Sequence, residues 1–371
     1  MASKEKLNFG IVGACTRGKS FKTALDAVGA VRVRAVCDIN EDGLEEARVT
    51  LGADEAYADY AEMLQKADLD AVVVATPMPL HVPQAIAALE KGMHVCTEVP
   101  ASVSVEESRE LVRAANASDG TYMMAENYTY TKPCMLIAEL VRQGLFGTTY
   151  YGEGEYLHEL KELNEITRWR RRWQTGVNGI TYPSHSLGPL LHWMPGERVT
   201  EVCCAGSGHH YIDPRGDEYE MEDSCVMLGR MSSGGLVKIR LDMLSERPHS
   251  CSNYQLQGTK GAYESARGPG QRHRIWLAEL HGSPAEWHNL EELEDEYLPR
   301  VWREASEEAK KAGHGGGDYM EILDFVNACL GVAPPPVGIH EAMDMTLPGL
   351  VSQQSIQEDG RWLPVPDSRE W

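Results

Sequence analysis

The first turn of the sequence has the residue types and the spacing of a dinucleotide-binding loop. Gly13-Ala14-Cys15-Thr16-Arg17-Gly18 follows an apolar, strand-like run and precedes a helical pattern. In such a loop glycines permit a tight turn, and pyrophosphate approaches the N-terminus of the helix that follows. Cys15 stands where the second glycine is expected, so a Cβ would face the phosphate. The spacing therefore predicts a phosphate-binding turn that departs from the usual pattern at one position.

Asp38 is a second residue that could bind the dinucleotide. It ends the second strand-like run, 20 residues after Gly18. A carboxylate at this place accepts hydrogen bonds from both hydroxyls of the adenosine ribose and repels a 2′-phosphate. The alternative is an aspartate that only closes a strand-end turn. The turn and the carboxylate together predict a site for NAD(H) in preference to NADP(H).

Two further strand ends carry polar residues. They read Thr76-Pro77-Met78-Pro79-Leu80-His81 and Glu98-Val99-Pro100-Ala101. Because ligands bind outside the carboxyl ends of the strands in open parallel sheets, we expect both segments near the nicotinamide. His81 has an equally good alternative, in which it caps a helix or packs in the core.

These residues need a scaffold of alternating strands and helices, and the pattern of residues 7–125 predicts one. Strand-like runs lie at 7–12, 31–37, 71–75, 94–97 and 122–124, and helical patterns at 20–28, 41–51, 79–90 and 105–117. Ser104-Val105-Glu106-Glu107 has the form of a capping box. Alternating strands and helices imply right-handed β-α-β units and a parallel sheet. Residues 1–125 are therefore predicted to form an α/β Rossmann domain.

The pattern changes after residue 125 and predicts a second domain, residues 126–371. Helical patterns lie at 135–143, 186–193 and 318–330, and strand-like runs at 149–156, 200–205, 224–230, 235–241 and 253–258. Gly-containing turns separate several of these strands, which is typical of an α+β domain with a largely antiparallel sheet. A length of 371 residues agrees with two domains.

The charge balance and the cysteines limit the partners of the protein. Lys and Arg total 35, Asp and Glu total 56, and the net charge is −21. Such a surface disfavours binding to nucleic acid and to anionic membranes. The nine cysteines form no C-x-x-C pair, so a reduced, cytoplasmic protein without a metal site is expected. No apolar run could span a membrane, and residues 1–6 lack an export signal.

Four polar clusters in the second domain could carry chemistry. Tyr156-Leu157-His158 ends a strand, and the period of two places Tyr156 and His158 on one face. The other clusters are Arg168-Trp169-Arg170-Arg171-Arg172-Trp173, Tyr182-Pro183-Ser184-His185 and Gly313-His314-Gly315-Gly316-Gly317-Asp318, with Asp318 as a candidate N-cap. Each has a purely structural alternative: a core tyrosine, surface Arg–Trp packing or a glycine hinge.

Together, these motifs resemble the Gfo/Idh/MocA oxidoreductase family over nearly the whole chain. The similarity includes Ala75-Thr76-Pro77, Gly92-Met93-His94-Val95, Glu98-Val99-Pro100 and Val365-Pro366-Asp367-Ser368. It implies a Rossmann domain, a second domain with an open sheet, and a homodimer or homotetramer. Its usual dehydrogenases have Glu-Lys-Pro where this chain has Glu98-Val99-Pro100, and an Asp where it has Thr181.

At the positions where it differs from those dehydrogenases, the sequence resembles a branch of NAD-dependent glycosidases similar to glycoside hydrolase family 109. The matching motifs are Glu98-Val99-Pro100-Ala101, Tyr156 with His158, Arg168-Trp169-Arg170, Tyr182 to Pro189 with Ser184 for Thr, and His314 to Asp318. The resemblance implies bound NAD⁺, transient oxidation of a sugar at C3, removal of the C2 proton, elimination at C1, addition of water and re-reduction. This differs from glycosidases that use two carboxylic acids.

The resemblance also implies roles for the site residues. Tyr156 is the candidate base at C2, with His158, Tyr182 and His185 as its catalytic partners. The cofactor would contact Gly13, Cys15, Thr16, Arg17, Asp38, Thr76, Pro77, His81, Glu98, Val99, Asn127, Trp169 and Arg170. The glycoside, neutral or anionic, would contact Glu98, Arg168, Arg172, His314 and Asp318. The alternatives are an NAD-dependent sugar dehydrogenase and a noncatalytic NAD sensor.

Overall fold

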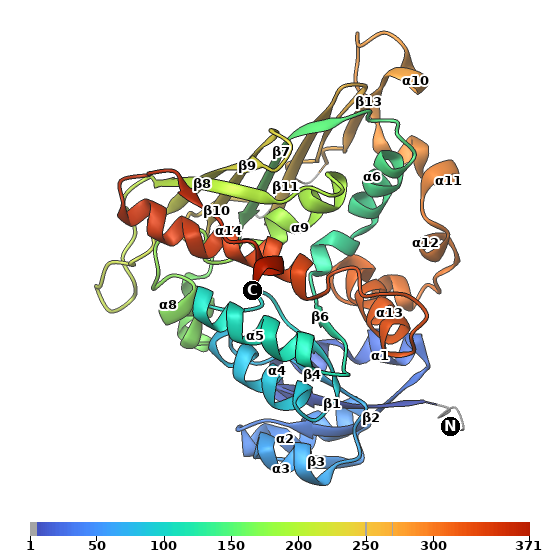
Figure 1. Cartoon of the computed structure of the whole chain (residues 1–371), viewed down its shortest axis with the longest axis vertical. Coiled ribbons are helices and arrows are strands. Elements are labelled where there is room, and N and C mark those ends of the chain that lie inside the picture. The colour runs from blue at the N-terminus through green and yellow to red at the C-terminus, as the bar shows by residue number, and fades with distance from the viewer. Residues whose placement is uncertain (1–5, 249–250, 269) are drawn as a thin grey trace. The chain divides into compact units, whose positions relative to one another are not determined.

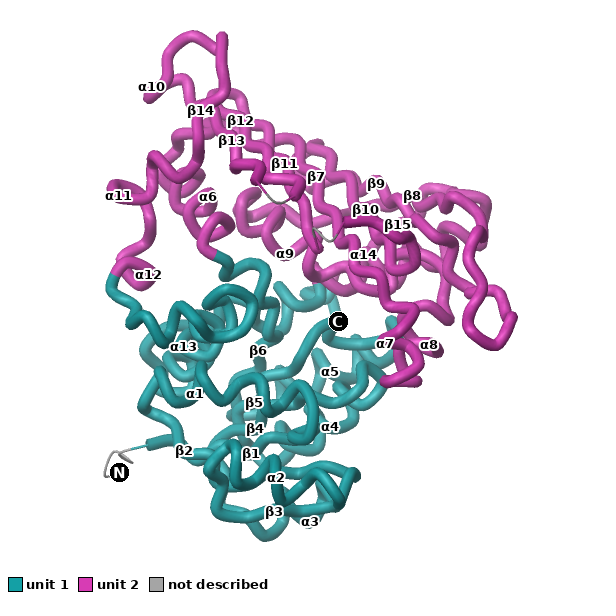
Figure 2. Tube along the Cα trace, turned by 180° about the vertical axis from the view of Figure 1, so that it is seen from behind, with its two compact units in different colours: residues 1–131, 304–343, 368–371 teal, residues 132–303, 344–367 magenta. Residues whose placement is uncertain are grey.

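The structure is a computed structural model, and it describes residues 6–248, 251–268 and 270–371 (Figure 1). Residues 1–5, which carry most of the expectation about an export signal, lie outside the described residues. The chain divides into two compact units (Figure 2). Unit 1 comprises residues 1–131, 304–343 and 368–371, and unit 2 comprises residues 132–303 and 344–367. The division at residue 126 stays a prediction about the domains.

Unit 1 contains a six-stranded sheet in the order β3-β2-β1-β4-β5-β6, and every pair is parallel. The strands are β1 (Leu7–Val12), β2 (Val31–Cys37), β3 (Glu55–Tyr57), β4 (Ala71–Val74), β5 (His94–Thr97) and β6 (Tyr122–Met124). All of β4 is buried, as its run of valines predicts. The strand order reverses between β1 and β4, which makes their carboxyl ends the expected binding edge. The predicted Rossmann architecture is confirmed.

The helices of unit 1 include α1 (Lys22–Val28), α2 (Glu41–Leu51), α3 (Tyr60–Lys66), α4 (His81–Leu89), α5 (Val105–Ala117) and, from late in the chain, α13 (Gly317–Cys329). Helices α2, α3 and α5 of unit 1 each begin at a side chain that accepts a backbone amide of the first turn. Ser104 accepts the Glu107 amide at the start of α5, and Glu107 accepts the Val103 amide, so the capping box is present. Helix α13 packs on the sheet through Phe325, whose ring meets Phe9 of β1 at 5.6 Å.

Unit 2 contains a nine-stranded sheet in the order β14-β13-β12-β11-β7-β10-β9-β8-β15, in which only β7 and β10 pair in parallel. Its strands are β7 (Thr149–Leu157), β8 (Val199–Gly206), β9 (Ser224–Met231), β10 (Leu236–Asp242), β11 (Cys251–Gly258), β12 (Gly261–Glu264), β13 (Arg274–Leu277), β14 (His288–Asn289) and β15 (Leu363–Pro364). The largely antiparallel sheet is therefore confirmed.

The helices of unit 2 are mostly short. They are α6 (Lys132–Arg142), α7 (Lys161–Ile166), α8 (Trp169–Trp173), α9 (Ser184–Trp193), α10 (Ala278–His281), α11 (Glu294–Tyr297) and α12 (Arg300–Glu304). Trp193 holds the end of α9, because its indole N–H donates to the Cys134 carbonyl of α6 at 2.9 Å. No helix among the described residues is long and apolar enough to cross a membrane.

The 19-residue helix α14 (Ile339–Gln357) was not predicted from the pattern. It contains Pro348, and its apolar residues form no single stripe along one face. Strong periodicity is expected only for a helix with one buried side. Residues such as Thr346 and Ser352 are buried in α14, so the helix is covered on more than one side.

Candidate active site

The first turn of unit 1 has the geometry of a phosphate-binding loop. Gly13 has a φ of 81°, and a Cβ on Gly13 would lie 2.5 Å from the Ala75 carbonyl oxygen, so only glycine fits. The Cys15 amide donates to the Asp38 carboxylate at 2.8 Å, which fixes Asp38 at the end of β2. Burial, and then the Asp38 charge, raises the pKa of the Cys15 thiol to about 11, so Cys15 stays protonated. Thr16 is exposed at the tip of the turn.

The neighbouring strand ends complete a set of residues that fits a dinucleotide. Thr76 and Pro77 follow β4, Glu98 and Val99 follow β5, and Asn127 follows β6. Parallel strands place these ends on one edge of the sheet. Asn127 is buried, and its side-chain oxygen has no hydrogen-bond partner among the described residues. A buried acceptor without a partner is costly, and a bound group with an N–H or O–H donor would satisfy it.

His81 is held by two backbone carbonyls. Its Nδ1 lies 2.9 Å from the Pro100 oxygen, and its Nε2 lies 2.8 Å from the Thr76 oxygen. Burial lowers the pKa of His81, although these two contacts oppose the shift. The structural alternative for His81 is therefore realised, since the ring ties together the loops after β4 and β5. A contact with the cofactor stays a prediction.

Arg17 faces carboxylates of unit 1 on several sides. Its Nε donates to Glu98 at 2.5 Å and its Nη1 to Asp318 at 2.7 Å, while Nη2 lies 3.8 Å from Glu321. The guanidinium also stacks over the Phe21 ring at 4.2 Å. The predicted contact of Arg17 with the cofactor stays a prediction, whereas its role as a link between these acids is visible in the structure.

Asp318 joins Arg17 to His314. The His314 Nδ1 lies 2.7 Å from the Asp318 carboxylate. Burial alone would raise the pKa of Asp318, but the bonds from His314 and Arg17 outweigh it and lower the pKa to about 2. The prediction that Asp318 caps the helix is wrong: Gly316 is the N-cap, and the Asp318 side chain lies buried inside the first turn.

In unit 2, close packing of α9 on β7 brings the predicted catalytic pair Tyr156 and His158, at the end of β7, near the predicted pair Tyr182 and His185, around the start of α9. A Cβ on Gly154 of β7 would lie 2.5 Å from the Ser186 carbonyl oxygen of α9, so the two elements touch through their backbones. The Tyr254 hydroxyl, from β11, donates to the His185 carbonyl at 2.5 Å and anchors the start of α9. Tyr156 and His185 therefore lie on facing elements.

Tyr156, His158, Tyr182 and His185 form one aromatic cluster. The Tyr156 hydroxyl lies 2.9 Å from His158 Nδ1. The Tyr156 ring stacks on Tyr182 at 5.6 Å, and the His185 ring meets each tyrosine ring at 5.0 Å. Tyr156 is only 7% exposed. The structure thus brings together all four residues predicted to be catalytic.

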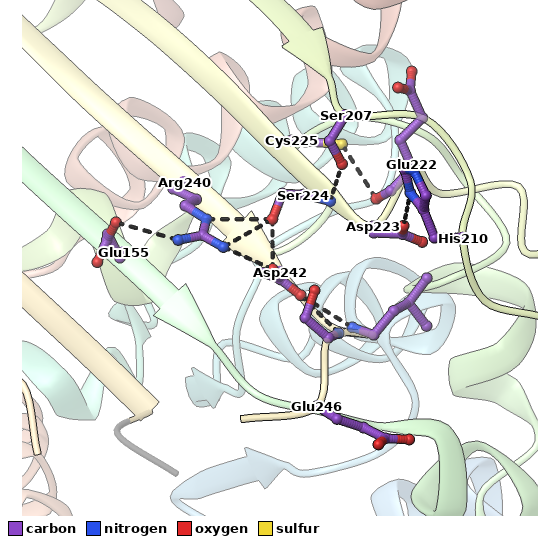
Figure 3. Close-up of polar contacts among 12 residues, drawn as sticks. Glu155, Ser207, His210, Glu222, Asp223, Ser224, Cys225, Arg240, Asp242 and Glu246 are labelled. Carbon is purple, nitrogen blue, oxygen red and sulfur yellow. Dashed lines mark hydrogen bonds and ion pairs between the residues drawn. The ribbon is translucent and has the colours of Figure 1, made fainter. Parts of the chain in front are cut away.

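A polar network fixes the strand end beside His158 (Figure 3). The His158 amide donates to the Asp242 carbonyl at 2.9 Å, which extends the pairing of β7 with β10. The Asp242 carboxylate accepts Ser224 Oγ at 2.5 Å, Arg240 Nη2 at 2.9 Å and the Ser245 amide at 2.9 Å. Arg240 also lies 3.8 Å from Glu155. Because Glu155 adjoins Tyr156 in a strand, this network braces β7 from the opposite face.

The Arg–Trp segment forms α8. The Arg170 guanidinium lies 4.4 Å over the Trp169 ring and bonds Gln174 at 3.1 Å. Arg168 and Arg172 are exposed. They line a surface depression together with Arg171, Arg215, Asp213, Asp217 and Glu220. Arg171 pairs with Asp213 at 3.3 Å and Arg215 with Glu165 at 2.6 Å, so these two arginines are neutralised.

The sequence reasoning missed several residues that support these clusters. Glu321 is one of them, although the helical period places it on the same face as Asp318. Asp242 ends a strand, which is a general signal for a site residue in a sheet. Glu155 and Tyr254 carried no local signal, because their partners lie on other elements.

Comparison with known proteins gives two family matches. Residues 7–126 match the NAD-binding Rossmann fold of an oxidoreductase family, and residues 130–370 match the C-terminal domain of glycosyl hydrolase 109. A glycosyl hydrolase family 109 protein of Saccharopolyspora erythraea is 31% identical, over 98% of this chain and 83% of the relative. An alpha-N-acetylgalactosaminidase of Shewanella oneidensis is 28% identical, over 98% of this chain and 85% of the relative.

Solved structures show the same fold at low identity. An NAD-binding oxidoreductase from Klebsiella pneumoniae matches with a TM-score of 0.82 and 19% identity, over 98% of this chain and 100% of that one. Levoglucosan dehydrogenase in complex with NADH and levoglucosan matches with a TM-score of 0.81 and 20% identity, over 97% of this chain and 100% of that one.

Proposed function

Because the chain belongs to glycosyl hydrolase family 109, we propose that it cleaves a glycoside by transient oxidation of the sugar at C3. The family and the NAD-binding Rossmann fold support an NAD-dependent enzyme that acts on a sugar. The chemistry that NAD⁺ supplies when bound is reversible hydride exchange with C3 of that sugar. The net reaction is then hydrolysis, with no accumulation of NADH.

The observation that carries this proposal is the hydrogen bond between Tyr156 and His158. With its proton on Nε2, His158 accepts the Tyr156 hydroxyl at Nδ1 and favours loss of the tyrosine proton. A ketone at C3 makes the C2 proton acidic, so a tyrosinate is a sufficient base there. Tyr156 takes the C2 proton, the electrons of the C2–H bond form a C1=C2 double bond, and the C1–O bond breaks with its electron pair leaving on the aglycone oxygen.

The remaining groups have supporting roles in this proposal. Tyr182 and His185 orient the sugar and deprotonate the hydroxyl that is oxidised. Gly13, Cys15, Thr16 and Asp38 hold the phosphates and the adenosine ribose, and Glu98 and Asn127 serve the nicotinamide end. Water then adds its hydroxyl group to C1 and its remaining proton neutralises the departed aglycone oxygen, Tyr156 returns its proton to C2, and reduction at C3 restores the hydroxyl. The homodimer or homotetramer and the contacts of Trp169 and Arg170 stay predictions.

A panel of 4-nitrophenyl α- and β-glycosides, neutral and charged, tests the proposal. Nitrophenol release and the absorbance of NADH are followed together after NAD⁺ is added. We expect nitrophenol release that exceeds NADH by far. NADH formed in step with oxidation of an intact glycoside would identify a sugar dehydrogenase, which is the alternative, and would contradict the glycosidase. Binding of NAD⁺ without turnover of any glycoside would contradict both.

A further inference from the structure

One guanidinium and two carboxylates form a cluster at the end of β5 in unit 1. Arg17 donates from Nε to Glu98 at 2.5 Å and from Nη1 to Asp318 at 2.7 Å. The side chains of Glu98 and Asp318 are only 11% and 0% exposed. A single positive charge therefore serves two carboxylates in a largely buried place, and negative charge is in excess there.

A third carboxyl group beside Arg17, that of Glu321, does not add to this charge. Glu321 is fully buried, and neither of its oxygens has a hydrogen-bond partner among the described residues. Burial, and then the Asp318 charge, raises the pKa of Glu321 well above its usual range. Burial also opposes ionisation of Asp318, but the bonds from His314 and Arg17 outweigh it and lower the pKa of Asp318 to about 2. Glu321 is therefore protonated at neutral pH, whereas Asp318 is charged.

The cluster adjoins the half of the sheet edge where the nicotinamide is expected. Asp38 marks the adenosine half at the end of β2, so the ends of β5 and β6 belong to the nicotinamide half. Glu98 follows β5, and Asn127 follows β6. A Cβ on Gly317, the residue before Asp318, would lie 2.6 Å from the Asn127 carbonyl oxygen, so the start of α13 packs against this end. The buried Asn127 side-chain oxygen, without a partner in the described part of the chain, independently indicates a ligand there.

The two redox forms of the cofactor differ in charge at the nicotinamide ring. The ring is positive in NAD⁺ and neutral in NADH, while the phosphates and the adenosine are the same in both forms. Excess negative charge near the ring therefore attracts NAD⁺ more than NADH, and the attraction is strong where water is excluded. Val99, the residue after Glu98, is buried and uncharged, so it supplies no cation that would cancel this effect.

We propose that Glu98 and Asp318, only half neutralised by Arg17, set the redox preference of the cofactor site and favour bound NAD⁺ over bound NADH. The inference rests on the placement of the nicotinamide end in the proposed function. In a reaction without net oxidation, such a preference helps to return the site to its oxidised form at the end of each turnover. The two carboxylates act through their charge, and neither exchanges a proton in this role.

The ratio of two dissociation constants, Kd for NADH divided by Kd for NAD⁺, tests this role. NADH is titrated by its fluorescence and NAD⁺ by competition with NADH, at pH 8, which is above the ordinary titration range of histidine and so limits any charge on His314. Glu98→Gln keeps an oxygen that accepts from Arg17 but removes the charge. We expect the ratio to fall at least about tenfold, which corresponds to a rise of about 30 mV in the midpoint potential of the bound cofactor. Asp318→Asn should shift the ratio in the same direction.

Glu321→Gln is the matched control, because Glu321 lies in the same helix as Asp318 and is already uncharged. Its ratio should equal that of the wild type, and circular dichroism verifies that each variant is folded. An unchanged ratio in folded Glu98→Gln or in folded Asp318→Asn would overturn the inference, as would a fall of the same size in Glu321→Gln. Failure of the glycosidase proposal is a separate result, since it shows in the nitrophenol assay, whereas these titrations require no turnover.

Discussion

Gly154 and Ser186 bring strand β7 and helix α9 into backbone contact: a Cβ built on Gly154 would lie 2.5 Å from the Ser186 carbonyl oxygen. This contact aligns Tyr156, two residues further along β7, with His185 at the start of α9. The rings of Tyr156 and His185 lie 5.0 Å apart as a result. The aromatic cluster of unit 2 thus depends on a residue that has no side chain.

Gly154→Ala should therefore lower both stability and activity. An added methyl group must push α9 away from β7, at a cost of about 1–3 kcal/mol. We expect a lower thermal midpoint and a reduced kcat, since Tyr156 and His185 separate. Gly268→Ala is the matched control, because a Cβ there meets nothing within 4 Å. A Gly154→Ala protein as stable and active as this control would contradict the packing argument.

Tyr156→Phe should abolish turnover while it leaves the fold intact. The phenyl ring keeps the contacts with Tyr182 and His185, but the proposed base at C2 is lost, so we expect kcat to fall by about 10³-fold or more. The control is Tyr151→Phe on the same strand, where the hydroxyl donates to Glu153 at 2.6 Å. Equal activity of the two variants in the nitrophenol assay would exclude Tyr156 as the base.

Asp38→Asn should change the choice of cofactor. Loss of the charge would weaken the proposed contact with the ribose hydroxyls and remove the proposed repulsion of a 2′-phosphate. We expect the ratio of the Kd values for NADP⁺ and NAD⁺ to fall by at least about tenfold in a binding titration. Asp26→Asn removes the same charge from an exposed position of α1 and should leave the ratio unchanged. An unchanged ratio in Asp38→Asn would contradict the role of Asp38.

Asp318 and Glu321 lie one helical turn apart. Their contributions to the stability of the fold should change with pH in opposite directions. The pKa of Asp318 is lowered from 3.8 to about 2, so its ionised form contributes up to about 2 kcal/mol above pH 4, which is lost as the pH falls toward 2. Burial, and then the Asp318 charge, raises the pKa of Glu321 well above its usual range. The native state then holds a proton that the unfolded chain releases, so this contribution declines as the pH rises above about 4.5.

Thermal unfolding of two variants, measured without cofactor, checks the direction of these two pH dependences. Asp318→Asn should lower the midpoint at pH 7, and the difference from wild type should shrink below pH 4. Glu321→Gln should raise the midpoint relative to wild type, with a difference that grows from pH 5 to pH 8. Differences that do not change with pH would show that neither carboxyl has a shifted pKa in the folded protein.

Arg168 and Arg172 should select anionic substrates, if the substrate carries a charge. Both are exposed, whereas their neighbours Arg171 and Arg215 are already paired with acids. Replacing Arg168 and Arg172 by Ala should reduce kcat/KM for a charged glycoside at least about tenfold more than for its neutral counterpart. Arg215→Ala serves as the control. Equal losses on both glycosides would contradict the proposed selectivity.

The sequence predicted the parts of the structure that depend on short-range patterns. The parallel sheet of unit 1 follows from alternating periods, and the period of two placed Tyr156 beside His158. Contacts between distant segments could not be predicted: Arg17 and Asp318 lie 301 positions apart. Helix α14 was missed because it contains a proline and lacks a polar face. The N-cap role of Asp318 was wrong because Arg17 and His314 draw its carboxylate inward.

The position of deuterium in the released sugar tests the central claim most directly. The protein, NAD⁺ and a nitrophenyl glycoside are incubated in heavy water, and the free sugar is examined by NMR. Removal of the C2 proton by Tyr156 and return of the hydride to C3 predict deuterium at C2 and hydrogen at C3. Release of sugar with hydrogen at both positions would show that the C1–O bond breaks without deprotonation at C2, and would contradict the account.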